Sequence, residues 1–175
     1  VSFPGGMMAT LLNRPLAIHE QNSIAGLANR LLAKLADRVL AGFPAPFPAS
    51  TAVIWTGNPV RSEIAGLDAP AARYRGRAGV LRLTVIGGSL GAQALNATLP
   101  QALALLPEAE RPLVTHQSGA RHLDEVEANY RSAGVEATLV PFITDMPSHY
   151  ATADLFICRA GASTIAELAA ARIAR

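Results

Sequence analysis

Two kinds of apolar pattern alternate along the chain: short continuous runs, and longer segments whose apolar residues recur three or four positions apart. The short runs predict strands and the longer segments predict helices. After residue 80 the expected order is strand 80–86, helix 91–106, strand 112–116, helix 120–133, strand 135–140, a short helix near 145–152, strand 154–158 and helix 163–172. Before residue 60 the expected elements are strands 15–19, 38–41 and 52–55 and a helix over 23–36. This alternation is typical of α/β proteins with doubly wound parallel sheets.

The helix expected at 23–36 carries an apolar stripe, which consists of Ile24, Leu27, Ala28, Leu31 and Leu35. Residues 62–79 contain Gly, Pro, Asp and Arg without a strong period, so we expect an interdomain linker. The linker separates residues 1–61, the carboxyl-side part of a first domain, from residues 80–175, a second domain. The chain begins in an expected loop, Val1–Gly6, and ends just after a helix, so we expect both domains to be incomplete.

Composition argues against several classes of protein, among them nucleic-acid-binding, disulfide-bonded, membrane-spanning and metal-binding proteins. Half of the 175 residues are hydrophobic, which is ample for a core, and the net charge of +2 is too small to indicate nucleic-acid binding. A single cysteine, Cys158, excludes internal disulfides and is typical of a reducing compartment. No apolar run approaches the ~18 residues of a membrane span. No spacing of His, Cys, Asp and Glu suggests a metal site.

The segment Leu83–Asn96 is the most informative. A short apolar strand ends in Gly87 and Gly88, and a helix follows Gly91. Such a junction exposes backbone N–H groups beside a helix N-terminus, which favours an anion. The spacing fails the Gly-x-Gly-x-x-Gly dinucleotide pattern, and no Lys-Ser/Thr follows as in a P-loop. We therefore expect a phosphate-bearing ligand other than NAD or ATP; the alternative is a turn that only packs helix on strand.

Polar or glycine-rich segments follow other expected strands. His19–Asn22 lies at a strand end, where α/β sheets bind ligands, although Asn22 or Ser23 could simply cap a helix. Gly57–Arg61 ends in an arginine suited to a diphosphate, but the pattern alone favours a tight turn followed by a surface arginine. His116, at another strand end, could line a cleft or be a structural histidine.

A second glycine-bordered helix start lies at Cys158–Glu167. Thr164 and Glu167 fit the Ser/Thr-x-x-Glu capping box, which would make Glu167 a partner of the backbone. The alternative is that Glu167 accepts hydrogen bonds from ribose hydroxyls, as acidic residues do in nucleotide-binding folds.

Six segments together resemble the MurG family of bacterial glycosyltransferases, in the family's order and over essentially the whole chain. They are His19–Asn22, Gly57–Arg61, Gly87–Ala92 with Asn96, His116–Gly119, Pro141–Met146 and Cys158–Glu167. The resemblance implies a GT-B architecture of two Rossmann-like domains. It also implies inverting transfer of N-acetylglucosamine from UDP-N-acetylglucosamine to undecaprenyl-diphospho-muramoyl-pentapeptide, the lipid I to lipid II step of peptidoglycan synthesis. No cofactor and no metal are implied.

Site residues also follow from the resemblance. The positions that match donor-binding residues are Asn22, Arg61, Ser89, Ile143, Ala162, Ser163, Thr164, Ile165, Ala166 and Glu167, beside the phosphate loop of Gly87, Gly88 and Gly91. The positions on the acceptor side are Ser2, Gly5, Gly6, Glu20 and Asn96, of which the first three match the end of a glycine loop. The general base is expected upstream of Val1, with His19 as the fallback.

The resemblance further implies peripheral association of the first domain with the cytoplasmic face of the bacterial inner membrane. The family's first glycine loop and its sugar-binding glutamines have no counterpart in residues 1–175, so we expect this chain alone to be inactive. Two other readings stay open. One is another UDP-sugar enzyme of GT-B architecture, an epimerase or a natural-product glycosyltransferase. The other is a non-catalytic nucleotide-binding module.

Overall fold

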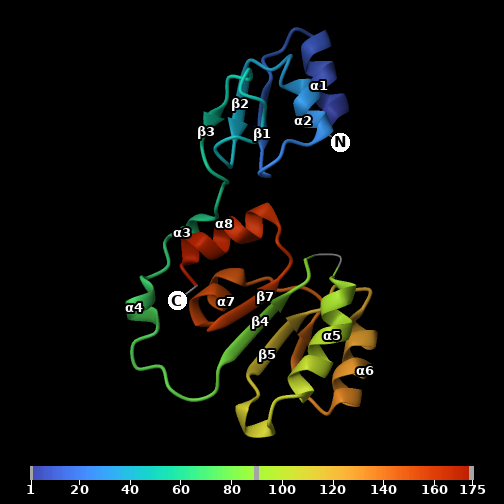
Figure 1. The fold of residues 1–175 in the computed structure, drawn as a ribbon, viewed down its shortest axis with the longest axis vertical. Helices are drawn as coiled ribbons and strands as arrows, with labels where there is room; N and C mark the ends of the chain where they lie inside the picture. The colour runs from blue at the N-terminus through green and yellow to red at the C-terminus, as the bar shows by residue number, and fades with distance from the viewer. Residues whose placement is uncertain (1, 89–90, 174–175) are drawn as a thin grey trace. The chain divides into compact units, whose positions relative to one another are not determined.

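The computed structural model describes residues 2–88 and 91–173, which form two compact units that divide between Val60 and Arg61 (Figure 1). Each unit contains one parallel sheet, so the predicted α/β class is confirmed. Within the described residues, no helix is long and apolar enough to cross a membrane.

Unit 2, from Arg61 onward, is built on a parallel sheet with the strand order β6-β5-β4-β7. Its strands are β4 (Arg82–Ile86), β5 (Leu113–Gln117), β6 (Thr138–Val140) and β7 (Leu155–Cys158). Its helices are α3 (Ser62–Ala65), α4 (Pro70–Arg73), α5 (Gln93–Ala104), α6 (Leu123–Ala133), α7 (Met146–Thr152) and α8 (Ala162–Ala171), with a short 3-10 helix at Glu108–Glu110.

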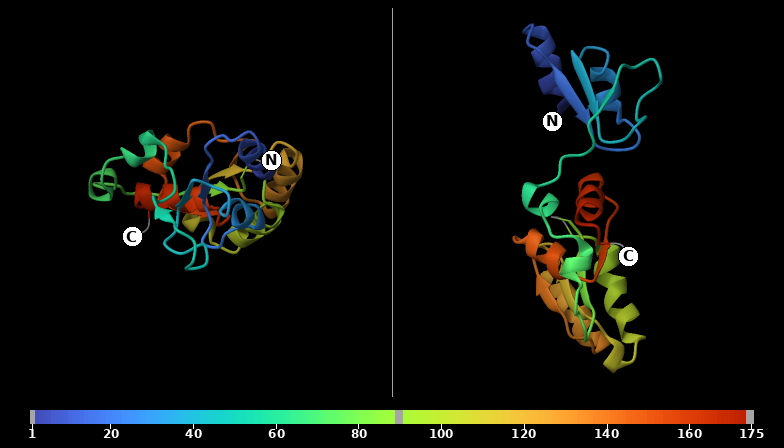
Figure 2. Two further views of the ribbon diagram at one scale, coloured as in Figure 1. Left: turned by 90° about the horizontal axis from the view of Figure 1, so that it is seen from above. Right: turned by 90° about the vertical axis from the view of Figure 1, so that its left-hand side faces the viewer.

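The order of the strands determines where the helices lie. The chain runs from β4 to β5 to β6 and then returns past β4 to β7. Right-handed crossovers therefore put α5 and α6 on one face of the sheet and α7 on the other. Helices α5 and α6 pack side by side (Figure 2). Strand β4 is buried along nearly its whole length, as a central parallel strand should be, and Val85, Val126 and Tyr130 belong to the core.

Residues 62–79, expected to be a linker, have regular structure and are tied to unit 2. Arg73 donates a hydrogen bond to the carbonyl oxygen of Tyr150 at 2.7 Å, and Arg77 forms an ion pair with Asp154 at 2.6 Å. Both partners lie 77 residues further along the chain, so local periodicity could not reveal these contacts.

Unit 1, Val1–Val60, contains a three-stranded parallel sheet in the order β1-β2-β3. Its elements are α1 (Ser2–Leu11), β1 (Ala17–Glu20), α2 (Leu27–Leu32), β2 (Arg38–Ala41) and β3 (Ile54–Trp55). Its core contains Ile18, Leu32, Val39 and Phe47.

Two predictions for unit 1 are wrong. The first residues form α1 rather than a loop. The helix expected at 23–36 is shortened to α2, and most of its apolar stripe is exposed: 80% of Ile24 and 72% of Leu27 remain accessible. The stripe therefore does not pack on the sheet within unit 1.

Glu20 organises the turn after β1. Its side chain is 3% exposed and accepts four hydrogen bonds of 2.9 to 3.0 Å, from the backbone N–H groups of Asn22 and Gly26 and the side-chain amides of Asn22 and Asn29. Burial opposes the charge, but these hydrogen bonds together outweigh it and hold the pKa of Glu20 below its ordinary value. A buried carboxylate with this set of partners fixes the local backbone.

Replacing Glu20 by Gln should lower the free energy of unfolding at neutral pH by about 1.5–3 kcal/mol, the range for hydrogen bonds to a charged group. Because folding lowers the pKa of Glu20, its stabilisation is present above the ordinary pKa of 4.5 and is lost as the pH falls through the folded value. Denaturant unfolding of both proteins from about pH 7 to about pH 3 measures this. Glu136→Gln, at an exposed carboxylate, is the matched control. A difference that does not shrink in acid would contradict the assignment.

Candidate functional site

The topology of unit 2 creates a switch point between β4 and β7. Ile86 and Cys158 end these strands and are register partners. The segments that follow them, from Gly87 and from Arg159, therefore start side by side at the carboxyl edge of the sheet. Open α/β sheets bind ligands at such a point. The glycine-bordered segments that lead to the two helix starts thus leave the sheet from neighbouring strands.

The glycines of the first segment have different roles. A Cβ on Gly87 would lie 2.6 Å from the backbone N of Ala92. Gly91 has a φ of +76°, and the carbonyl oxygen of Ser118 fills the space that a side chain would need. These contacts agree with the packing interpretation. Gly88, by contrast, is exposed and has open space around it, as the approach of a ligand requires. The segment is thus compatible with both interpretations.

Helices α5 and α8 begin at this edge without a side-chain cap. Their N-cap residues, Ala92 and Gly161, make no side-chain hydrogen bond to the first turn. The N-terminal N–H groups of both helices therefore carry uncapped partial positive charge, which favours an anion. Ser89, predicted to bind the donor, lies outside the described residues.

The start of α8 also corrects the capping-box interpretation. Gly161 is the N-cap, so Thr164 is the third residue of the helix and cannot cap it. Glu167 then lies too far into the helix to complete a capping box. The remaining predicted residues of the segment, Ala162 to Ala166, form the first turns of α8.

Glu167 accepts hydrogen bonds from two side chains that are distant in sequence. The guanidinium of Arg61 binds it in a bidentate manner, with Nε 2.9 Å from Oε1 and Nη2 3.0 Å from Oε2. The hydroxyl of Tyr150 donates to Oε2 at 3.1 Å. Two residues predicted separately to bind a ligand are therefore paired with each other. The side chain of Arg61 is 47% exposed, so little stability is lost when this pair opens.

Tyr150 is the buried member of this cluster and was not predicted. Its side chain is almost fully buried and stacks on Phe156, with ring centroids 5.0 Å apart. Burial, together with the charge of Glu167, raises the pKa of Tyr150, so its hydroxyl stays protonated. The hydrogen bond to Glu167 raises the pKa of Arg61. A single aromatic residue in a short helix gave no local signal of this role.

His116 has the structural role that the sequence left open. Its ring lies 3.0 Å from the hydroxyl of Tyr130 and 3.1 Å from Oδ1 of Asn96. Burial lowers the pKa of His116 to about 4, so the ring is neutral. The amide of Asn96 also donates to the carbonyl oxygen of Ser118 at 3.1 Å. Asn96 is thus used inside unit 2, and its acceptor-side role stays a prediction.

Gln117 and Ile143 connect two loops at the carboxyl edge of the sheet. The backbone N–H of Ile143 donates to Oε1 of Gln117 at 3.0 Å, and Nε2 of Gln117 donates to the carbonyl oxygen of Gly88 at 2.9 Å. Ile143 is buried and its N–H is already bonded, so a ligand contact would need its other atoms. Gln117 was not among the predicted site residues, although its motif was.

In unit 1, parts of two predicted segments meet at the carboxyl edge of the sheet. Nε2 of His19 lies 3.1 Å from the carbonyl oxygen of Gly57, and the amide of Asn58 donates to the carbonyl oxygen of Gln21 at 3.0 Å. A Cβ at Gly42 would collide with the amide of Asn58. The two segments therefore form one packed turn region.

Asn22 is exposed and is held by Glu20, so its side chain is accessible to a ligand. The alternative that Asn22 or Ser23 caps a helix is wrong, because α2 begins at Leu27 with Gly26 as its N-cap. Gly26 itself is held by Glu20.

The acceptor-side residues Ser2, Gly5 and Gly6 lie in α1 rather than in a loop. A Cβ on Gly6 would come within 2.6 Å of the Leu32 side chain, so this glycine lets α1 approach α2 closely. The role of these three residues toward an acceptor stays a prediction.

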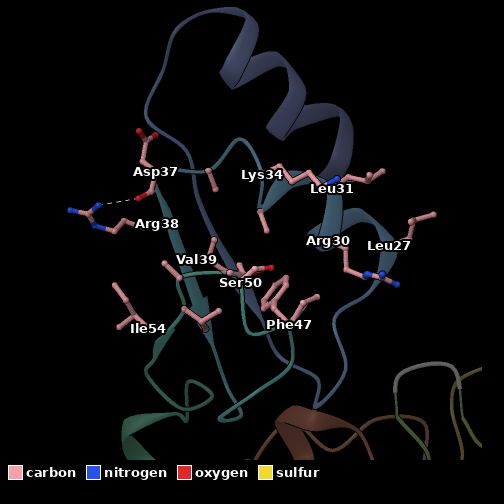
Figure 3. Close-up of a pocket in the computed structure, with 16 residues that line it drawn as sticks. Leu27, Arg30, Leu31, Lys34, Asp37, Arg38, Val39, Phe47, Ser50 and Ile54 are labelled. Carbon is pink, nitrogen blue, oxygen red and sulfur yellow. Dashed lines mark hydrogen bonds between the residues drawn. The ribbon is translucent and has the colours of Figure 1, made fainter.

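A groove in unit 1 lies between α2, the start of β2 and residues 47–54 (Figure 3). Val39 and Phe47 line it, and so do Arg30 of α2 and Lys34 of the turn after α2. None of the predicted site residues lines this groove, which lies at the amino end of β2. The groove is therefore separate from the carboxyl edge of this sheet, where the predicted segments around His19 and Gly57 meet.

Among residues 2–88 and 91–173, no group of three or more His, Cys, Asp and Glu is arranged to hold a metal ion. The free Cys158 is half-buried at the end of β7, and burial raises the pKa of its thiol. This thiol is therefore a weak nucleophile.

Comparisons with known proteins identify the family. Residues 82–174 match the model of the glycosyltransferase family 28 C-terminal domain. A transferase from Cupriavidus necator, named UDP-N-acetylglucosamine–N-acetylmuramyl-(pentapeptide) pyrophosphoryl-undecaprenol N-acetylglucosamine transferase, is 62% identical over 99% of this chain and 48% of its own length. A protein of the same name from Nitrosospira multiformis is 61% identical over 99% of this chain and 48% of its own.

The crystal structure of Acinetobacter baumannii MurG matches with a TM-score of 0.74 and 40% identity, over 97% of this chain and 47% of that one. These matches confirm the resemblance and the GT-B fold class drawn from the sequence motifs. The chain spans about half the length of the curated relatives it matches. The match of residues 82–174, more than half of the chain, shows that this protein belongs to glycosyltransferase family 28.

Proposed function

We propose that the protein containing this chain transfers N-acetylglucosamine from UDP-N-acetylglucosamine to undecaprenyl-diphospho-muramoyl-pentapeptide. The observation that carries the proposal is the switch point of unit 2, where the segments that lead into two uncapped helix N-termini start side by side. An anion such as the donor diphosphate is favoured there. The names of relatives that are 61–62% identical support the same substrates.

The cluster around Glu167 supplies the second part of the donor site. A ribose with two neighbouring hydroxyls can donate one hydrogen bond to each carboxylate oxygen. In the structure Arg61 occupies both oxygens. Ribose binding would therefore displace Arg61, and the freed guanidinium could bind the diphosphate, whose oxygens suit its fork. Both donor-binding roles proposed for this pair are compatible with these contacts, because Glu167 and Arg61 would separate first and then each bind a different part of the donor.

The chemistry follows from this arrangement. A hydroxyl of the acceptor sugar would attack the anomeric carbon and displace UDP with inversion, and negative charge would develop on the diphosphate. The N–H groups at the starts of α5 and α8, with Arg61, would stabilise that charge. One exposed helix N-terminus contributes only ~0.3–1 kcal/mol, so two termini and a cation would stabilise the developing charge more than one terminus alone.

The general base stays assigned to the segment expected upstream of Val1. His19 is the fallback within the chain. Its Nε2 contacts the carbonyl oxygen of Gly57, so the bond favours the tautomer with the proton on Nε2 and leaves Nδ1 as the basic atom. The two rival functions, another UDP-sugar enzyme or a non-catalytic module, lose support because the named relatives at this identity are transferases.

We also propose that the first domain attaches the enzyme to the membrane surface where its lipid-linked acceptor lies. The exposed apolar residues Ile24, Leu27, Leu31 and Leu35 support this, because Arg30 and Lys34 lie in the same stretch of chain, in and just after α2. Apolar residues beside cations are typical of surfaces that bind anionic lipids. The location proposed is the cytoplasmic face of the bacterial inner membrane.

Ligand preference tests the central proposal. The complete gene product containing residues 1–175 should bind UDP-N-acetylglucosamine and UDP more tightly than NAD or ATP, because the phosphate loop lacks both alternative fingerprints. Calorimetry with the four ligands gives the dissociation constants, and transfer of labelled sugar to the lipid acceptor gives the activity. Equal or tighter binding of NAD would overturn the proposal.

Glu167→Gln should weaken UDP binding by about tenfold or more, because a charge-assisted hydrogen bond contributes roughly 1.5–3 kcal/mol. The free energy of unfolding should change by less than about 1 kcal/mol, since the pair with Arg61 is half exposed. A UDP analogue without the ribose hydroxyls is the control: wild type should bind it more weakly than UDP, and the variant should bind both alike. A variant that still prefers UDP would refute the ribose role.

The membrane proposal predicts that Leu27→Ser with Leu31→Ser reduces binding to vesicles of anionic phospholipid by roughly tenfold or more, because two apolar side chains no longer insert. Leu105→Ser, at another exposed leucine in unit 2, should bind as the wild type does. Co-sedimentation with vesicles measures both proteins. Undiminished binding by the double variant would contradict the assignment of this stripe.

A further inference from the structure

The side chain of Gln117 reaches two loops: the candidate phosphate loop, through Gly88, and the loop after β6, through Ile143. Gln117 is the last residue of β5, where its register partners are Ile86 at the end of β4 and Val140 at the end of β6. The chain leaves β4 into the glycine segment and leaves β6 into the segment that contains Ile143. Gln117 thus lies between the starts of the two loops.

The amide of Gln117 bonds to both loops. Its Nε2 donates to the carbonyl oxygen of Gly88 at 2.9 Å, and its Oε1 accepts from the backbone N–H of Ile143 at 3.0 Å. These two partners fix the orientation of the amide, because a carbonyl can only accept and an N–H can only donate. An ionised glutamate could make the second bond but not the first, and methionine, which has no donor and only a weakly accepting sulfur, could replace neither.

The bond to Ile143 is buried, and the bond to Gly88 is partly buried because Gly88 itself is exposed. Gln117 is 2% exposed, and Ile143 is 4% exposed. The N–H of Ile143 would be a buried donor without a partner if the amide were removed. The carbonyl oxygen of Gly88 also accepts from the N–H of Gly91 at 3.0 Å, so both of its lone pairs are used. These two donors hold the carbonyl oxygen of Gly88 toward Gln117 and Gly91. Its negative partial charge would therefore repel a bound anion less.

From this geometry we infer that Gln117 is a positioning residue that ties the phosphate loop to the segment at Ile143 and so sets the spacing between the diphosphate and nucleoside parts of the donor site. The inference rests on the proposed function, in which both loops contact a UDP-sugar. Gln117 itself need not touch the ligand. Its effect is to let the two loops bind one ligand as a unit.

Two substitutions of Gln117 test its bond to Gly88 and its bond to Ile143 separately. Gln117→Glu keeps the acceptor for Ile143 but puts a carboxylate against the carbonyl oxygen of Gly88, so the phosphate loop should shift. It should weaken UDP binding roughly three- to tenfold, the effect of one net hydrogen bond, while uridine binding changes less than about twofold. Gln117→Met, which is neutral and of similar length, releases both loops and should weaken both ligands.

The measurement is competition calorimetry of UDP and uridine on the complete gene product, with thermal unfolding of each variant. Gln101→Glu is the matched control, because it makes the same change on an exposed face of α5 and should leave both affinities unchanged. A purely structural role would lower the unfolding temperature and leave the ratio of UDP to uridine affinity unchanged in Gln117→Glu.

An unchanged ratio in the folded Gln117→Glu variant would overturn the inference, as would full UDP affinity in Gln117→Met. Failure of the proposed function gives a different result, because the wild-type protein itself would then fail to prefer UDP over NAD.

Discussion

The register between β4 and β7 is the constraint on which the candidate site depends. Because the strands are parallel and Ile86 pairs with Cys158, the segments after both strands must start together. Each segment leads into a helix without a side-chain cap, so the sheet brings two positive helix ends to one edge. A one-residue shift of β7 would turn its side chains to the opposite faces and displace Glu167 from Arg61. The candidate ligand edge is therefore a consequence of strand pairing more than of any single motif.

Two glutamates from the sequence motifs show how partners decide between structure and function. Glu20 is buried, and its partners are backbone N–H groups and two asparagines that hold one turn. Removing any of them would leave a buried charge short of donors. Glu167 has one buried partner, Tyr150, and one half-exposed partner, Arg61, which solvent or a ligand can replace. The same residue type is thus a fixed anchor in unit 1 and an exchangeable acceptor in unit 2.

Sequence patterns predicted the strands well, because burial on both faces of a parallel sheet demands short apolar runs; 38–41 was predicted with the bounds that β2 has. Helices that depend on distant partners were missed. α4 forms in the expected linker, where Arg73 is held by a carbonyl group 77 residues away. The helix expected at 23–36 starts late because Glu20 binds the N–H of Gly26. The motifs predicted candidate site residues, but the contact between Arg61 and Glu167 spans 106 positions and has no local signature.

Adjacent residues at the end of β5 explain why the His-Gln-Ser-Gly segment carries so many polar groups. Side chains alternate along a strand, so His116 and Gln117 must satisfy different surroundings. His116 is neutral and bonds to Tyr130 and Asn96. This network anchors α5 and α6 to the strand. Gln117 anchors the loops after β4 and β6. A buried polar network specifies one geometry because each missing partner is costly, whereas apolar packing tolerates small shifts. The end of β5 thus connects α5 and α6, through His116, with the two loops that would hold the ligand, through Gln117.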